Sequence, residues 1–192
     1  RQNLRRMEAE PLRDSILHVA GALSSDMYGA PTAIARRPDG EVVVNDGKLP
    51  QKRSIYLRNK RSAPVSILQL FDQPDIETNC TRRNQSTVPL QALSLLNSDL
   101  VVNAAEAFAD RVLLESPQDP IGYAFMAVTG RRADAEQLQA LAGFILRQSD
   151  IYLRSGQDEQ KTATEQELQQ ASRLALVDLC HVLLSSNEFA YI

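Results

Sequence analysis

The chain of 192 residues contains no tryptophan, and aromatic residues make up only 5% of it. Strand-rich cores draw on aromatic and β-branched side chains, whereas leucine and alanine are strong helix formers. Hydrophobic residues at 43% and charged residues at 23% are ordinary for a globular protein, and the length suits one domain with its own core. The shortage of aromatics therefore favours a mainly helical fold.

Cysteine is almost absent as well. Cys80 and Cys180 lie one hundred positions apart, with neither a CxxC pair nor the CxxCH motif that attaches haem. We expect two buried free thiols, and a Cys80–Cys180 disulfide is the alternative if the protein is exported.

Motifs of catalysis and metal binding are missing from the sequence. It holds no glycine-rich phosphate loop, no GxSxG elbow and no HExxH zinc motif. His18 and His181 each have one acid nearby, Asp14 and Asp178, which indicates hydrogen bonds on a helix surface rather than a metal site. Haem ligation by either histidine is a weaker alternative. We therefore expect no metal and no cofactor in this chain, and the sequence leans against an enzyme without deciding the question.

No apolar run approaches the ~20 residues of a membrane span, so no span is predicted. The first ten residues, RQNLRRMEAE, lack both an initiator methionine and the apolar core of a signal peptide. They resemble the interior of a helix. We expect the chain to be a piece of a longer protein.

Charge is unevenly distributed along the chain. The net charge is −3, which favours neither nucleic acid nor an anionic membrane as a partner. Residues 36–61 nevertheless carry eight Lys or Arg against three Asp or Glu. This basic stretch fits an anionic ligand or an acidic neighbouring domain, and a solvated basic loop is the simpler alternative.

Apolar residues at helical spacing occupy most of the chain. They predict helices over residues 2–23, 65–71, 90–97, 98–112, 121–129, 134–154 and 168–184. Pro11 kinks the first helix or restarts it. Ser86 or Thr87 is expected to cap the helix whose inner face carries Leu90, Leu93 and Leu96. Residues 168–184 are apolar nearly all round after Leu174, which is typical of the most buried helix.

Residues 29–62 lose the helical period. Two short runs, 41–44 and 54–57, are typical of strands, and Asn45-Asp46-Gly47 of a turn. The prediction is a mainly α fold: one domain over residues 1–192, built as an irregular bundle of about six or seven helices. Within it, residues 29–62 form a basic, loop-rich insertion with room for a small β-ribbon.

Arg82-Arg83-Asn84 precedes a predicted helix start and forms the leading candidate site. Two guanidinium groups beside free backbone N–H groups suit a carboxylate, sulfate or phosphate. Arg53 and Arg61 of the basic insertion are further candidates for binding an anion or a partner. The alternative is structural, with the arginines paired to the nearby acids Asp72, Asp75 and Glu77. Under the binding hypothesis, Asp72 is also a candidate base.

Several blocks of sequence resemble one known family. They are EAEPLRDSILHVAG, RSIYL with FDQPD, CTRRNQSTVPLQALSLLN and DLCHVLLSSNEFAYI, in this order. The chain resembles the planctomycete-type domain called PSD one, domain of unknown function 1553. It departs from the family's pattern at Pro11 and in the glycine-poor turn at residues 30–34.

The resemblance implies a context rather than an activity. Such domains form the C-terminal part of large exported proteins that also contain a cytochrome-c-like domain, so a c-type haem is expected only elsewhere in the parent protein. We therefore expect a non-catalytic helical module that docks on an upstream domain of the same polypeptide, either cytochrome-like or substrate-handling. The alternative is an anion-binding or catalytic half-site for a sulfated or acidic saccharide, built on Arg82 and Arg83.

Overall fold

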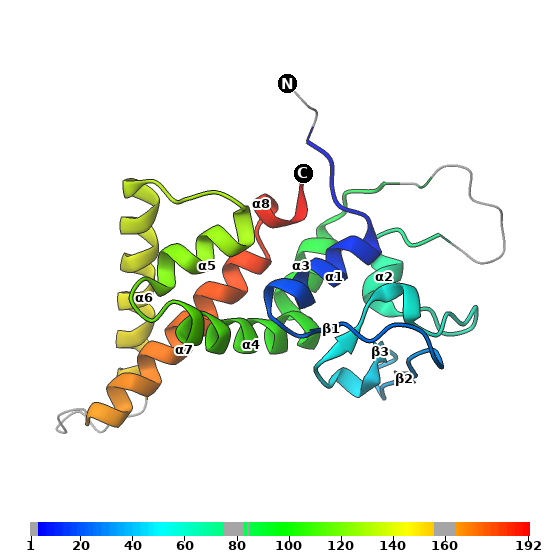
Figure 1. Cartoon of the computed structure of the whole chain (residues 1–192), viewed down its shortest axis with the longest axis horizontal. Helices are drawn as coiled ribbons and strands as arrows, with labels where there is room; N and C mark the ends of the chain where they lie inside the picture. Colours follow the sequence, from blue (N-terminus) through cyan, green and yellow to red (C-terminus); the bar gives the residue numbers. More distant parts are fainter. Residues whose placement is uncertain (1–3, 75–82, 84, 156–163) are drawn as a thin grey trace.

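The computed structural model describes residues 4–74, 83, 85–155 and 164–192, and its helices form an irregular bundle (Figure 1). The α-helices are α1 (Ala9–Val19), α2 (Ser66–Leu70), α3 (Pro89–Asn97), α4 (Asp99–Glu115), α5 (Pro120–Thr129), α6 (Ala135–Ser155), α7 (Glu165–Leu184) and α8 (Asn187–Ala190). The strands are β1 (Leu23–Ser24), β2 (Ile34–Arg36), β3 (Val42–Val44) and β4 (Gln51–Lys52), with 3-10 turns η1 (Asn45–Gly47) and η2 (Ser54–Tyr56). The predicted mainly α fold is confirmed.

Helices α4 and α7 form the centre of the molecule. In Figure 1, α5 and α6 lie towards one end, α1, α2, α3 and the strands lie towards the other, and α7 runs from the first end to the middle. Helix α7 packs against both α6 and α4, and α1 packs against α2, η2 and α4. The apolar stripe predicted on α4 is fully buried: Val101, Ala104, Ala105, Phe108 and Val112. Seven of the 20 residues of α7 are buried, against six of the 11 residues of α1, so the expectation that α7 is the most buried helix is wrong.

The first predicted helix is corrected by the structure. Helix α1 begins at Ala9, and Pro11 lies in its first turn, where a missing N–H donor costs no hydrogen bond. The residues before it are extended and pair with the end of the chain. Arg5 N–H donates to Ile192 O at 2.8 Å, and Met7 N–H donates to Ala190 O at 2.8 Å. The segment therefore gains its hydrogen bonds from a distant partner rather than from a helix.

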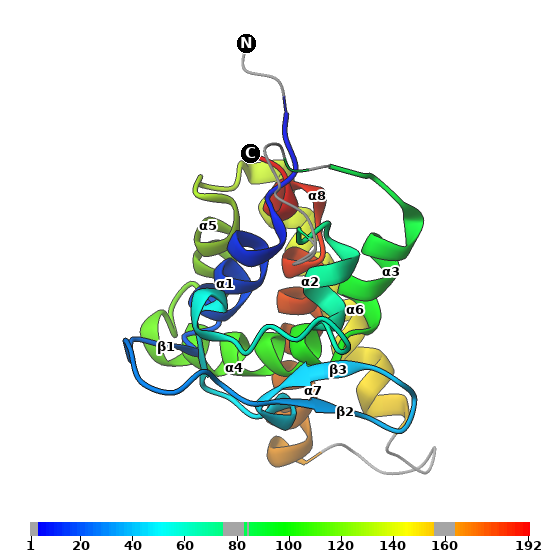
Figure 2. The ribbon, with the colours of Figure 1, turned by 90° about the vertical axis from the view of Figure 1, so that its right-hand side faces the viewer.

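The insertion holds the expected small ribbon, but only one of its two predicted strands. Strand β3 pairs antiparallel with β2, whereas residues 54–56 form the 3-10 turn η2. A second, parallel pair joins β4 to β1. Figure 2 shows β2 and β3 lying along one side of the molecule, below α1 and α2.

Helix α3 faces the core with residues other than those predicted. Leu90, Leu93 and Leu96 are exposed, and the buried residues of this helix are Gln91 and Leu95. Gln91 turns inward because its amide donates to Leu70 O at 3.0 Å. Within the described residues, no helix is both long and apolar enough to cross a membrane.

The raised pKa values of one buried thiol and one partly buried phenol make the fold sensitive to alkali. Burial raises the pKa of the Cys180 thiol to about 12. Burial and a 2.8 Å hydrogen bond to Asp178 raise the pKa of the Tyr152 hydroxyl to about 12. A thiol ionises near ~8.5 and a phenol near ~10 in an unfolded chain. The stability that these groups contribute is therefore complete below those values and is lost as the pH rises towards 12.

We predict a slope of about −1.4 kcal/mol per pH unit from Cys180 alone above pH ~9, in the free energy of unfolding. Urea unfolding at several pH values between 8 and 11 measures it, in a Cys80→Ser background so that one thiol titrates. In Cys180→Ala the slope should flatten by this amount. An unchanged slope would show that the thiol is not protected from ionisation by the fold.

Candidate functional site

The structure describes part of the predicted site. Arg53, Arg61, Asp72 and Cys180 lie within the described residues, and so does Arg83. The remaining candidates lie outside them: Arg82, Asn84, Asp75, Glu77 and Cys80. Cys180 is buried and is a free cysteine.

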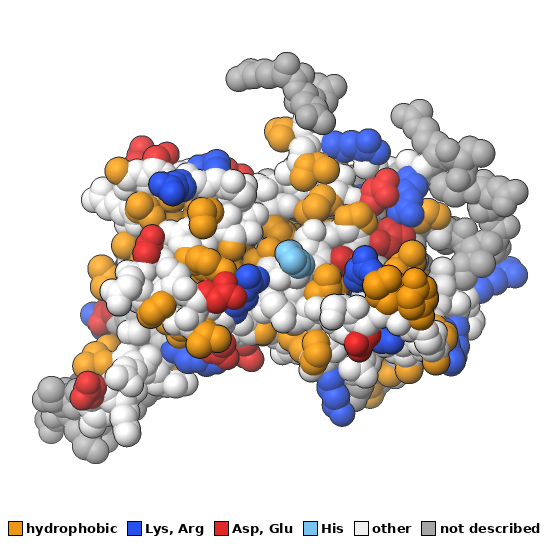
Figure 3. Space-filling view, in the orientation of Figure 1, with side chains coloured by type: hydrophobic (Ala, Val, Ile, Leu, Met, Phe, Trp, Pro, Cys, Tyr) orange, Lys and Arg blue, Asp and Glu red, His pale blue; other side chains and the backbone are white. Residues whose placement is uncertain are grey.

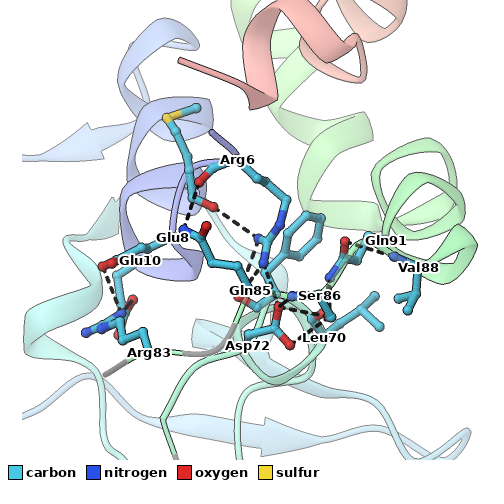
Figure 4. Close-up of polar contacts among 12 residues, drawn as sticks. Arg6, Glu8, Glu10, Leu70, Asp72, Arg83, Gln85, Ser86, Val88 and Gln91 are labelled. Atoms are coloured by element: carbon cyan, nitrogen blue, oxygen red, sulfur yellow. Dashed lines mark hydrogen bonds and ion pairs between the residues drawn. The ribbon is translucent and has the colours of Figure 1, made fainter. Parts of the chain in front are cut away.

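Arg83 reaches across to the start of α1. Its Nη1 donates to Glu10 Oε2 at 2.6 Å and lies 3.2 Å from Glu8 Oε2 (Figure 4). All three side chains are partly exposed, and ion pairs of this kind contribute about 0–1 kcal/mol. Arg83 thus pairs with acids of the chain, as the structural alternative proposed, but these two partners lie more than seventy residues away in sequence.

Asp72 is held by Arg6 and Ser86. The Arg6 Nη2 atom donates to Asp72 Oδ2 at 2.6 Å, and Ser86 donates to the same carboxylate through its N–H at 2.7 Å and its hydroxyl at 2.8 Å. Arg6 is only 6% exposed and also lies over the Phe71 ring, with Cζ 5.2 Å from the centroid. Asp72 therefore serves to fix the N-terminal segment to the end of α2.

The polar residues before α3 and in its first turn also form hydrogen bonds within the chain. Gln85 Nε2 donates to Arg6 O at 3.4 Å, and the Gln91 amide donates to Ser86 Oγ at 3.3 Å besides its bond to Leu70. The N-cap of α3 is Val88, whose N–H donates to Gln91 Oε1 at 3.4 Å. The expected cap by Ser86 or Thr87 is therefore wrong: Ser86 bonds Asp72, and the Gln91 side chain covers the helix start.

A cleft of about 590 Å³ opens beside this network. Its walls come from the first turns of α1, from residues 53–59 and from α2, and Arg83 stands at its edge. Volumes of about 300–1,000 Å³ are usual for ligand sites. Over the part of the molecule containing α1 and α2, Figure 3 shows basic, acidic and hydrophobic side chains close together.

One wall is fastened to α1 by two consecutive residues. Arg13, 1% exposed, donates to Gln51 Oε1 at 2.5 Å, to Ser54 Oγ at 3.1 Å and to Lys52 O at 3.2 Å. The Asp14 carboxylate accepts from the Ser54 N–H at 2.9 Å and from its hydroxyl at 2.7 Å. Desolvation lowers the pKa of Arg13, and the neighbouring Asp14 carboxylate opposes that shift. Arg13 and Asp14 together hold the segment of residues 53–59 in position against α1.

The acidic side chains that line the cleft have partners within the chain, whereas two of its arginines have no carboxylate partner among the described residues. Glu8 and Glu10 pair with Arg83, and Asp14 is held by Ser54 and Arg13. Arg53 and Arg58 have no carboxylate partner within the described chain. The Arg53 guanidinium lies 5.8 Å from the centroid of the Tyr56 ring. The cleft therefore offers two uncommitted positive charges, which suits an anionic group.

The other predicted residues lie elsewhere. Arg61 is exposed and does not line the cleft, and neither does Asp72. A ring nitrogen of His181, Nε2, lies 3.3 Å from Leu95 O, and His18 is exposed at the end of α1. Among the described residues, no three His, Cys, Asp or Glu side chains gather as a metal site would require.

Sequence reasoning missed Arg58, Arg6 and Arg13. Arg58 belongs to the basic stretch, and nothing in the local sequence distinguishes it from its neighbours. For Arg13 a signal was present: it precedes Ile16 by three positions and Leu17 by four, which places it on the buried face of the helix.

The family model described as PSD1, protein of unknown function (DUF1553), matches residues 1–145. The chain belongs to the PSD1 family. The matched part of this PSD1 chain contains α1 to α5, the insertion and every residue of the cleft, and it ends within α6. Neither curated proteins nor solved structures gave a match to the chain.

Proposed function

We propose that this PSD1 chain is a non-catalytic binding module whose cleft holds an anionic group of another molecule. The observation that supports the proposal is the division of charge in the cleft. Its three carboxylates are held by groups of the chain itself, whereas Arg53 and Arg58 have no carboxylate partner among the described residues. A partner that supplies an anion gains two charge-assisted contacts without breaking an internal pair.

The proposed setting is a larger exported protein that also contains a cytochrome-like or substrate-handling domain. The module would dock on that neighbouring domain through the basic insertion. This proposal rests on the family's implied context and on the positive charge of residues 36–61.

We predict that removing either cleft arginine weakens anion binding by about ten- to a hundredfold. A hydrogen bond to a charged group is worth about 1.5–3 kcal/mol, which corresponds to that range. Two anionic probes serve: a capped triglutamate peptide and a heparin-derived sulfated disaccharide. Isothermal titration calorimetry compares the wild type with Arg53→Ala and Arg58→Ala.

The matched control is Arg36→Ala, which removes the same charge from the same insertion. Arg36 is exposed on β2 and does not line the cleft. This variant should bind as the wild type does. The proposal fails if neither probe binds at millimolar concentration, or if binding survives in the double variant of Arg53 and Arg58.

A further inference from the structure

The shape and the lining of the cleft indicate which kind of molecule carries the anionic group. We infer that its ligand is a polypeptide segment that carries an acidic side chain next to an aliphatic one. This inference rests on the proposed function, because it names the molecule that supplies the anion.

The aliphatic part follows from the floor and mouth of the cleft. Val65 and Leu68, both buried, line it from the loop before α2 and from α2 itself, and Leu57 and Pro11 add further aliphatic surface. Ile55 also lines the cleft, yet it is 80% exposed. An aliphatic side chain that enters between these residues removes apolar surface from water on both partners.

Two amide side chains match the backbone of a peptide. Asn59 and Gln73 line the cleft, and neither side chain has a hydrogen-bond partner among the described residues. A side-chain amide both donates and accepts, so it can pair with the C=O and the N–H of one peptide group. Binding sites use a few polar groups of this kind on an apolar lining to orient a ligand.

The lining disfavours a saccharide. Within the described chain, no aromatic side chain faces the cleft. Sugar rings present flat C–H faces that aromatic rings cover well, and the cleft offers none. The aliphatic floor beside the two arginines instead complements an acidic and an aliphatic side chain in one short segment.

Three capped peptides test the inference. In the first, glutamates alternate with leucines; the second has glutamine in place of glutamate, and the third has serine in place of leucine. We expect the first to bind the whole chain, and each of the others to bind at least about tenfold more weakly. Ile55→Ser should weaken the first peptide by about tenfold and leave the weak binding of the serine peptide unchanged.

The outcomes separate this inference from the proposed function. If the sulfated disaccharide binds in a manner that depends on Arg53 and Arg58 while the glutamate–leucine peptide does not, the anion site stands and the peptide inference is overturned. Equal affinity for the leucine and serine peptides also overturns it, because the aliphatic contact is then absent. If no probe depends on these arginines, the proposed function itself fails.

Discussion

Arg13→Met is expected to lower the free energy of unfolding by about 3–5 kcal/mol, because it removes a buried arginine whose hydrogen-bond partners then lose their donor. The guanidinium of Arg13 satisfies the buried Gln51 carbonyl, the Lys52 carbonyl and the Ser54 hydroxyl, as well as Asp14. Methionine retains most of the volume but none of the donors. The loss is a large fraction of the ~5–15 kcal/mol that holds a typical domain together.

Urea unfolding followed by circular dichroism measures this change. The matched control is Arg147→Met, an exposed arginine on α6, which should stay within about 0.5 kcal/mol of the wild type. A similarly small effect at Arg13 would mean that the segment from Gln51 to Ser54 is held by something other than this side chain.

Arg6→Leu is expected to cost about 2–3 kcal/mol and to release the start of the chain. Arg6 donates to Asp72 at 2.6 Å and to Met7 O at 3.0 Å, and hydrogen bonds of charged groups lie at the strong end of the range. Without them, the extended segment before α1 loses its attachment to α2. Hydrogen exchange should therefore lose protection at the Arg5 and Met7 amides, which pair with the C-terminal residues.

A double-mutant cycle assigns this loss to the ion pair. Arg6→Leu, Asp72→Ala and the double variant should give a coupling energy of about 1–3 kcal/mol, since the two side chains touch. Additive effects, with protected Arg5 and Met7 amides in Arg6→Leu, would contradict the role given to Arg6.

The spacing of apolar residues predicted most of the helices, because these residues form the faces that the helices bury. The α4 stripe is buried as expected, and Gly130 ends α5 with a φ of 72°, where glycine pays no steric cost. The errors fall where a distant partner overrides the local signal. The segment before α1 pairs with the end of the chain, and Gln91, which reaches Leu70, lies with Leu95 on the inner face of α3 in place of the predicted leucines.

The candidate site was predictable only in part. The positive charge of residues 36–61 was visible in the sequence, and the binding of an anion by Arg83 stays a prediction. The partners of Arg83 were not visible there, since Glu8 and Glu10 are brought to it by the packing of α1 rather than by any spacing. For the same reason, sequence could not distinguish Arg58, which lines the cleft, from Arg61, which does not.

Nuclear magnetic resonance of the arginine side chains tests the binding site most directly. Protein labelled with ¹⁵N-arginine is titrated with the glutamate–leucine peptide, and the Nε–Hε signals are assigned through single Arg→Lys variants. Shifts at Arg53 and Arg58, with an unmoved signal from Arg36, are the predicted result. Shifts confined to arginines outside the cleft, or none at saturating peptide, would contradict the assignment of the cleft as the anion-binding site.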